Sequence, residues 1–236
     1  MALSAILFDM DGTLVPMDTD KFLPAYFKYL AAALCPLGVT PEALQKAVWS
    51  GVGAMVRNDG SKTNEAVFWD TFAQMTGLDP APFIAPANAF YAGDFNKARV
   101  ATSPNPLAAE AVRIAHEKAP RVILATNPLF PMDGQITRMG WVGLTPADFD
   151  LVTSYESDSF CKPNPAYYRA ICERIGVDPA DCLMVGNDVA EDMAAAASVG
   201  MRTFLVTDCM IPAEGVVYDG PQGAFPELLD FLSALA

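Results

Sequence analysis

Short continuous runs of apolar residues recur along the chain, and a polar residue follows each of them. The first run, Ala-Ile-Leu-Phe at residues 5–8, ends at Asp9. An uninterrupted apolar run of this length is typical of a strand that is buried on both faces of a sheet. The same reasoning predicts four further strands, at residues 121–125, 149–152, 182–185 and 202–206.

Between these strands lie stretches with helical character, most of which begin with a proline or an aspartate that favours the first helical turn. The predicted helices cover residues 106–118, 131–139, 165–175 and 190–199. Strands that alternate with helices form a parallel sheet with helices on its faces. We therefore predict an α/β protein with a doubly wound, mostly parallel sheet.

The pattern changes between residues 17 and 101, where strand-like runs give way to apolar residues at helical spacing. Thr40 followed by proline indicates the start of a helix, residues 58–61 (Asn-Asp-Gly-Ser) indicate a loop, and Gly77 indicates a helix end. We interpret this segment as an inserted cap of four helices. Three large aromatic residues of the cap, Trp49, Trp69 and Phe72, are interpreted as part of its hydrophobic core rather than as a cage for the substrate.

Proline-containing connections flank the insert, and such segments mark boundaries between compact units. They lie at residues 15–18 and 101–106. We therefore predict that residues 1–16 and 102–236 form the α/β core and that residues 17–101 form the cap.

Composition narrows the class of protein. The chain has 236 residues, of which 52% are hydrophobic and 18% charged, enough for a packed core. A net charge of −13 without a basic cluster argues against nucleic acid as a partner. No uncharged apolar run reaches the roughly 18 residues that a membrane span needs, which argues against a membrane protein. The five cysteines are widely spaced and form no CxxC pair, so we expect neither disulfides nor a zinc site, and a cytoplasmic location is predicted.

Polar residues that could carry chemistry stand at or just after the ends of the predicted strands. In open parallel sheets, ligands bind beyond the carboxyl ends of the strands, so these residues are the candidates for a site. They are Asp9, Asp11, Thr126, Asn127, Lys162, Asn187, Asp188 and Asp192.

Four segments that contain these residues resemble, in order, the four motifs of the haloacid dehalogenase (HAD) superfamily. Residues 8–15 (Phe-Asp-Met-Asp-Gly-Thr-Leu-Val) resemble the first motif, and the second aspartate places the chain with the phosphatase branch rather than with the dehalogenases. Thr126, Lys162 and residues 186–192 resemble the second, third and fourth motifs. The helical insert after the first motif is also similar to the family, in a phosphoglycolate phosphatase-like arrangement. Asn187 departs from the pattern, because many relatives have an acid directly after the glycine.

The resemblance implies a role for each residue. Asp9 would be the nucleophile that forms an aspartyl-phosphate, and Asp11 would be the general acid and base. Lys162 would act in catalysis and, with Thr126 and Asn127, would bind the phosphate.

The resemblance also implies Mg²⁺ as cofactor, held by Asp9, the backbone carbonyl of Asp11 and Asp188. Magnesium prefers such hard oxygen ligands. Asp192 would reach the metal-bound waters or Lys162, and Asn187 would support the site as a neighbouring contact. With Asp11 protonated, the remaining three carboxylates would balance the charge of the metal and Lys162.

Structural explanations exist for single residues. Lys162 could be a loop lysine, Thr126 a helix N-cap, and Asp188 with Asp192 acids at a helix start. Their joint occurrence at strand ends favours catalysis. In the cap, Arg57 and Lys62 could reach an anionic substrate, although loop cations are usually solvated.

The sequence therefore predicts Mg²⁺-dependent hydrolysis of the phosphate monoester of a small metabolite. Two alternatives stay open: a hexose-phosphate mutase-type transfer of the phosphoryl group, and a non-catalytic binding module on the same fold. The sequence does not specify the substrate or the oligomeric state.

Overall fold

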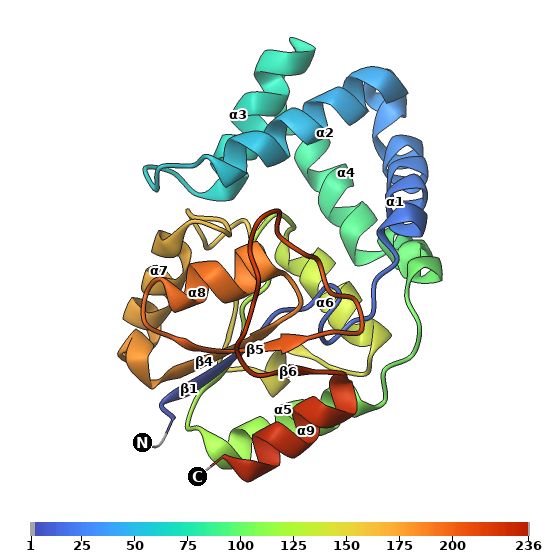
Figure 1. Ribbon diagram of the computed structural model, residues 1–236. Coiled ribbons are helices and arrows are strands. Elements are labelled where there is room, and N and C mark those ends of the chain that lie inside the picture. The colour runs from blue at the N-terminus through green and yellow to red at the C-terminus, as the bar shows by residue number, and fades with distance from the viewer. Residues whose placement is uncertain (1–2, 236) are drawn as a thin grey trace.

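The computed structural model describes residues 3–235 and has a six-stranded parallel sheet at its centre (Figure 1). The strand order is β3-β2-β1-β4-β5-β6. The chain moves outward from β1 to β3 and then crosses back to β4, so the topological switch point lies between β1 and β4. The strands are β1 (Ala5–Phe8), β2 (Val122–Leu124), β3 (Leu151–Val152), β4 (Cys182–Gly186), β5 (Arg202–Val206) and β6 (Gln222–Gly223).

Helices cover both faces of the sheet, which explains why its strands are apolar throughout. In β1, Ile6 and Phe8 pack on the face covered by α5 (Leu107–Lys118) and α9 (Phe225–Ala234). Ala5 and Leu7 pack on the face covered by α7 (Pro165–Ile175) and α8 (Ala195–Ala197). Figure 1 shows these two pairs of helices on opposite sides of the sheet.

A helical segment stands between β1 and α5, which we call the helical insertion (residues 19–101). In Figure 1 it lies above the α/β part, with α1 and α4 nearest the connections. N-cap side chains define several helix starts: Asp18 accepts from the Lys21 N–H, and Thr40 accepts from the Ala43 N–H. Its elements are α1 (Thr19–Leu34), η1 (Cys35–Leu37), α2 (Pro41–Val56), α3 (Asn64–Thr76), α4 (Ala81–Ala92) and the 3₁₀ helix η2 (Asp94–Ala101).

The predicted strands and helices are confirmed, with three differences. The structure adds β6 and α9 at the carboxyl end. It also adds short 3₁₀ elements, of which η1 and η2 extend the four predicted helices of the insertion and two lie in the α/β part. The predicted helix at 190–199 is instead a π-helical turn, η5 (Val189–Ala194), followed by α8, because the Asp188 carbonyl accepts from the Met193 N–H (3.1 Å) as well as from Asp192 (3.0 Å). The remaining elements are α6 (Met132–Trp141) and the 3₁₀ turns η3 (Pro146–Asp148) and η4 (Pro179–Asp181).

The aromatic residues of the insertion divide into two groups. Trp69 and Phe72 are buried as predicted, but Trp49 is 47% exposed, so its assignment to the core was wrong. Among residues 3–235, no single helix is long and apolar enough to cross a membrane, and the pair α1–η1 and α2, which meets that test together, bends by 112°.

Candidate active site

The end of β1 places two acids at the carboxyl edge of the sheet. The Asp9 N–H donates to the Val185 carbonyl (2.8 Å), so the ladder between β1 and β4 continues to this residue. The Thr13 hydroxyl lies 3.1 Å from Asn187 Oδ1 and 3.4 Å from Asp9 Oδ2. These contacts hold the Asp9 carboxylate beside the loop that follows β4.

The turn after Asp9 depends on a glycine. Val15 donates its N–H to the Met10 carbonyl (2.8 Å), and Gly12 donates to the Val15 carbonyl (2.7 Å). Gly12 has a φ of +87°, and a Cβ atom built on it would lie 2.2 Å from the Asn187 side-chain nitrogen. Only glycine fits both restrictions, which explains the Asp-Gly step in the sequence.

Lys162 is the centre of the charged cluster. Its side chain is 1% exposed, and its ammonium nitrogen lies 2.8 Å from Asp9 Oδ1 and 2.6 Å from Asp192 Oδ1. Burial disfavours the charged form of Lys162, but the two carboxylates outweigh burial and raise its pKa. Lys162 is therefore a fully buried cation with two anionic partners and not a solvated loop lysine.

Asp192 links this cation to the loop after β4. Its Oδ2 accepts from the N–H groups of Asn187 and Asp188, both at 3.1 Å. A Cβ atom on Gly186 would overlap its carboxyl group, so this close approach requires glycine. Burial raises the pKa of Asp192 to about 7, although the neighbouring Lys162 opposes this shift. Asp192 thus contacts Lys162, one of the two contacts expected of it.

Asp188 and Asn187 also have structural partners. Asp188 Oδ1 accepts from the N–H groups of Ala190 and Glu191, both at 2.8 Å, so it is the N-cap of the following turn. Asn187 accepts from Thr13 and donates to the Cys209 carbonyl (2.7 Å). The residue that departs from the family pattern therefore joins the loops that follow β1, β4 and β5.

Asp11 has a partner that the sequence did not reveal, the buried side chain of Arg138 on α6. The guanidinium donates to Asp11 Oδ2 and to Gln135 Oε1, and it stacks over the Phe130 ring with a centroid distance of 4.3 Å. A third of the Asp11 side chain faces the cleft, yet its Oδ1 is buried and has no hydrogen-bond partner within residues 3–235. Burial raises the pKa of Asp11, and Arg138 lowers it by less.

Thr126 and Asn127 lie directly beyond β2. The Thr126 carbonyl accepts from the hydroxyls of Thr153 (2.6 Å) and Tyr167 (2.9 Å), which fixes the backbone of this loop. Asn127 Nδ2 donates to Glu191 Oε2 (3.0 Å), while its Oδ1 is buried without a partner in the described part of the chain. Burial raises the pKa of Glu191 to about 7. Glu191 is a further residue of this cluster that sequence reasoning missed.

The insertion contacts the α/β part beside this cluster. Asn64, at the start of α3, is 0% exposed and donates to the Pro128 carbonyl (3.2 Å) and toward Cys161 Sγ (3.3 Å). Its backbone N–H donates to the Asp158 carbonyl (2.9 Å), and Asn58 donates to its Oδ1 (2.9 Å). The loop between α2 and α3 is thus hydrogen-bonded onto the loops that carry Asn127 and Lys162.

Within residues 3–235, neither Arg57 nor Lys62 forms an ion pair with the acids of the charged cluster. Lys62 pairs with Asp70 at 2.7 Å, with both side chains more than half exposed. Arg57 is an exposed residue at the end of α2. Lys62 is therefore a solvated cation paired with a neighbouring acid, as is usual for loop cations, and a contact with a substrate stays a prediction.

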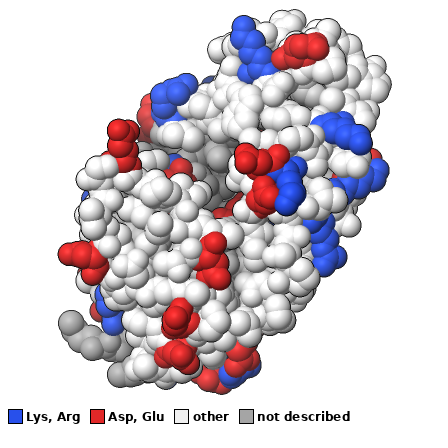
Figure 2. Space-filling model, turned by 45° about the vertical axis from the view of Figure 1, so that its right-hand side comes forward, with Lys and Arg blue, Asp and Glu red and all other residues white. Residues whose placement is uncertain are grey.

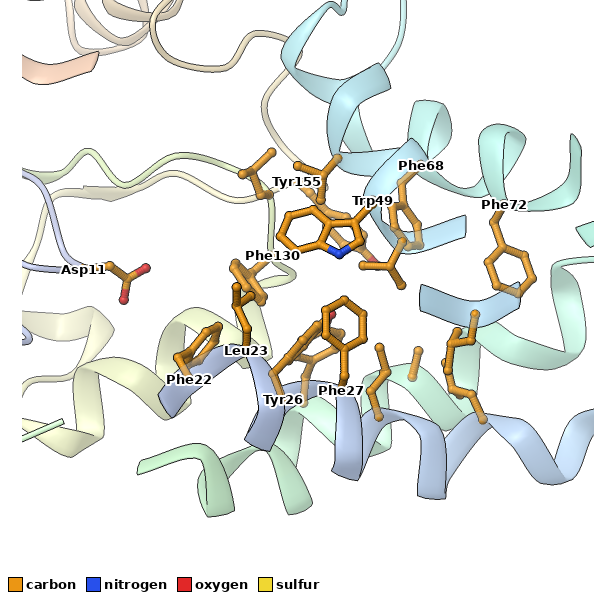
Figure 3. Close-up of a pocket in the computed structure, with 18 of the residues that line it drawn as sticks. Asp11, Phe22, Leu23, Tyr26, Phe27, Trp49, Phe68, Phe72, Phe130 and Tyr155 are labelled. Atoms are coloured by element: carbon orange, nitrogen blue, oxygen red, sulfur yellow. The ribbon is translucent and has the colours of Figure 1, made fainter. Parts of the chain in front are cut away.

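A cavity of about 240 Å³ opens from the cluster into the helical insertion. Asp11 lines one end of it, and the rest of the wall is almost entirely apolar and aromatic. Figure 3 shows Asp11 at one end, Phe68 and Phe72 at the other, and Tyr26, Phe27 and Trp49 between them. In Figure 2 the hollow between the two parts of the molecule is visible, with acidic and basic side chains around its rim.

The oxygen atoms at this edge of the sheet are of the kind that a magnesium ion binds. Within residues 3–235, no three His, Cys, Asp or Glu side chains converge as a complete ligand group. Magnesium usually takes one or two carboxylates and keeps several waters, so it does not require such a group. Asp9 and Asp188 supply carboxylates from the ends of adjacent strands, and the buried Oδ1 of Asp11 has no hydrogen-bond partner within residues 3–235, so an oxygen atom next to these carboxylates is left unsatisfied. The oxygen donors fit magnesium.

Comparison with known proteins identifies the family. The sequence profile of a haloacid dehalogenase-like hydrolase matches residues 3–200. The chain belongs to this family. A glyceraldehyde 3-phosphate phosphatase from Methanopyrus kandleri is 24% identical over 201 residues, covering 85% of this chain and 82% of that protein.

Two further similar proteins match different shares of the chain. Phosphatase MT3486 from Mycobacterium tuberculosis is 37% identical over 70 residues, which are 30% of this chain and only 32% of that relative's length. The structure of the HAD-hydrolase YfnB from Bacillus subtilis bound to magnesium has a TM-score of 0.60 at 18% identity, covering 98% of this chain and 99% of that one. The predicted family and α/β fold are confirmed, whereas the role of each site residue stays a prediction.

Proposed function

We propose that this HAD-family chain is a Mg²⁺-dependent hydrolase of phosphate monoesters that works through an aspartyl-phosphate on Asp9. The observation that carries the proposal is the position of Asp9. Its carboxylate is ion-paired with the buried Lys162, two residues before an acid that faces the cleft. The phosphatase names of the relatives support the same chemistry.

The first step uses Asp9 as nucleophile. An Asp9 carboxylate oxygen forms a bond to phosphorus as the bond from phosphorus to the ester oxygen breaks, and Asp11 gives its proton to the departing alkoxide. The raised pKa of Asp11 favours the protonated form that this step needs. Lys162 stabilises the charge on the phosphoryl oxygens, and Thr126 with Asn127 would donate hydrogen bonds to them.

The second step releases phosphate. Asp11, now ionised, takes a proton from water, the water oxygen forms a bond to phosphorus, and the bond from phosphorus to Asp9 breaks. Arg138 holds the Asp11 carboxyl in one orientation during both steps. Asp9, Asp188 and the Asp11 carbonyl would hold magnesium, which when bound would offset phosphoryl charge. Asp192 would keep Lys162 in place.

The proposal is tested by measuring inorganic phosphate released from a panel of phosphate esters, with magnesium or with EDTA. Wild type should release phosphate only with the metal, and Asp9→Asn should reduce the rate to background because an amide is a poor nucleophile. Asp20→Asn, which changes an exposed acid on α1, is the matched control and should behave as wild type.

The alternatives give different results in this assay. A mutase would convert one phosphate ester to another without net phosphate release, which ³¹P NMR of the reaction mixture would detect. A binding module would hold an ester without turnover. Either result in the presence of magnesium would contradict the proposal.

A further inference from the structure

We propose that the cavity in the helical insertion binds the organic part of the substrate, and that the substrate is the phosphate monoester of a hydrophobic alcohol with an extended carbon skeleton. This inference rests on the proposed function, because it assigns the substrate class of the same site. It is carried by the position, shape and chemistry of the cavity.

The position of the cavity links it to the reaction. Asp11, the proposed acid for the leaving alcohol, is part of the cavity wall. The atom that receives the Asp11 proton is the oxygen that carries the organic group. That group must therefore extend away from Asp11, and Figure 3 shows the cavity leading from this residue into the insertion.

The shape of the cavity favours an extended group. Its wall follows one face of α1, from Thr19 through Phe22, Tyr26 and Leu30 to Leu34. Residues 22–34 of a helix span about 18 Å at the usual rise per residue. The volume of 240 Å³ exceeds the roughly 150 Å³ of an apolar cavity that holds one benzene molecule. An alkyl chain, or an aromatic ring with a chain, matches these dimensions.

The chemistry of the wall disfavours sugars and other polyols. Asp11 is the one charged residue among the described residues that line the cavity. The hydroxyls of Tyr26 and Tyr91 are 2.8 Å apart and hydrogen-bonded to each other. Burial raises the pKa of Tyr26 to about 12, so it is neutral at pH 7. A buried hydroxyl without a partner would lower affinity by about 10- to 100-fold.

Few polar groups of the cavity wall are available to a substrate. The indole N–H of Trp69 is buried and has no partner at hydrogen-bond geometry within residues 3–235. It lies near the Tyr155 hydroxyl and lowers the pKa of that group, although burial raises this pKa by more. The Trp69 N–H and the hydroxyls of Thr19 and Tyr155 could orient one or two oxygen atoms, but they are too few to satisfy every hydroxyl of a sugar. The lining therefore selects a hydrophobic alcohol over a hexose, which also disfavours the mutase alternative.

The test is the dependence of kcat/KM on chain length for ethyl, butyl, hexyl, octyl and decyl phosphate, with glycerol phosphate as the polar comparison. Each added methylene should raise kcat/KM by about fourfold until the cavity is filled. Hydrolysis with a flat or falling dependence on chain length would overturn the inference and leave the proposed function intact.

A cavity-filling variant locates the effect. Leu23→Trp places a large ring beside Asp11, where Figure 3 shows Leu23 facing the cavity, and should reduce the octyl-to-ethyl ratio of kcat/KM by at least tenfold. Met75→Trp makes a similar change at an exposed site on α3 outside the cavity and should keep the wild-type ratio. Equal ratios in both variants would overturn the inference.

A binding measurement separates the two levels of the proposal. Octyl phosphate should change the intrinsic tryptophan fluorescence of Asp9→Asn, because Trp49 and Trp69 line the cavity, and this response should disappear in Asp9→Asn combined with Leu23→Trp. No phosphate release from any ester would refute the proposed function, and this binding response would still support the apolar site. Absence of both would refute the proposed function and the inference.

Discussion

The carboxyl edge of the sheet and the cavity above it meet at Asp11, yet they are built by opposite principles. At the edge, buried charges are matched one against another: Lys162 lies within 2.8 Å of two carboxylates, and Arg138 pairs with Asp11. The cavity wall beyond Asp11 carries almost no charge. A buried charge requires a partner in a fixed place, whereas an apolar wall requires only a suitable shape.

This difference predicts which property, stability, catalysis or specificity, a substitution in each region should change. Removing one charge at the edge leaves its partners buried and unpaired, so stability and catalysis should fall together. Changing one apolar residue of the cavity removes only part of a contact surface, so specificity should change with little loss of fold.

Replacing Lys162 should have the largest effect on the charged edge. In Lys162→Met, Asp9 and Asp192 lose their shared cation, and we expect about 3–5 kcal/mol of destabilisation because two buried like charges remain. The rate of phosphate release should fall by about 10³-fold, since a charge that stabilises the phosphoryl oxygens is lost. Urea unfolding and phosphate-release kinetics measure the two effects.

Lys162→Arg keeps the charge and serves as the folding control for this position. It should recover most of the stability and only part of the activity, because a planar guanidinium cannot occupy the same point between two carboxylates. A Lys162→Met protein with wild-type turnover would contradict the role assigned to this lysine.

Arg138 gives the next largest effect and tests whether it acts through Asp11. We expect Arg138→Gln to reduce kcat by about 10²-fold by freeing the Asp11 carboxyl to rotate. Asp11→Asn should reduce it more, and adding Arg138→Gln to that variant should cost little further. Such non-additivity identifies a positioning residue. Fully additive losses in this double-mutant cycle, measured as kcat, would show that Arg138 acts independently of Asp11.

The contrast between the two regions also explains which site residues could be predicted from the sequence. Asp9, Lys162 and Asp192 follow apolar strands, and strand order alone brings such residues together at one edge. Arg138 lies on a helix 127 residues after Asp11, and neither its burial nor its partner leaves a local pattern in the sequence. Glu191 lies within the fourth motif, but its contact with Asn127, 64 residues earlier in the chain, also leaves no local pattern in the sequence.

The cavity was still less accessible to prediction. Trp49, Trp69 and Phe72 have the spacing expected of helix cores, and the sequence pattern does not distinguish an aromatic residue that packs from one that lines a cavity. Only the arrangement of α1, α2 and α3 reveals the difference. The short β6 was missed because Gln222 and Gly223 form no apolar run.

A smaller effect is expected at the contact between the two regions. Asn64→Ala removes the side chain that donates to the Pro128 carbonyl, and we expect KM to rise about tenfold, with a smaller change in kcat, because the insertion loses a hold on the α/β part. Asn88→Ala, at an exposed asparagine of α4, is the matched control and should leave KM unchanged. Equal changes in KM in both variants would contradict this role of Asn64.

The smallest effect is expected at Trp49, which belongs to the cavity and is 47% exposed. Its ring packs against Phe27 with a centroid distance of 5.8 Å, so Trp49→Ala removes one face of the cavity wall without opening the buried core. We expect kcat/KM for octyl phosphate to fall about three- to tenfold and that for ethyl phosphate to change less, because only the longer chain reaches this ring. Leu37→Ala, at a similarly exposed apolar residue away from the cavity, should leave both values unchanged. If Trp49→Ala instead reduced the turnover of both esters equally and lowered the melting temperature, the ring would be a structural part of the insertion, and the cavity would share the dependence on partners that characterises the charged edge.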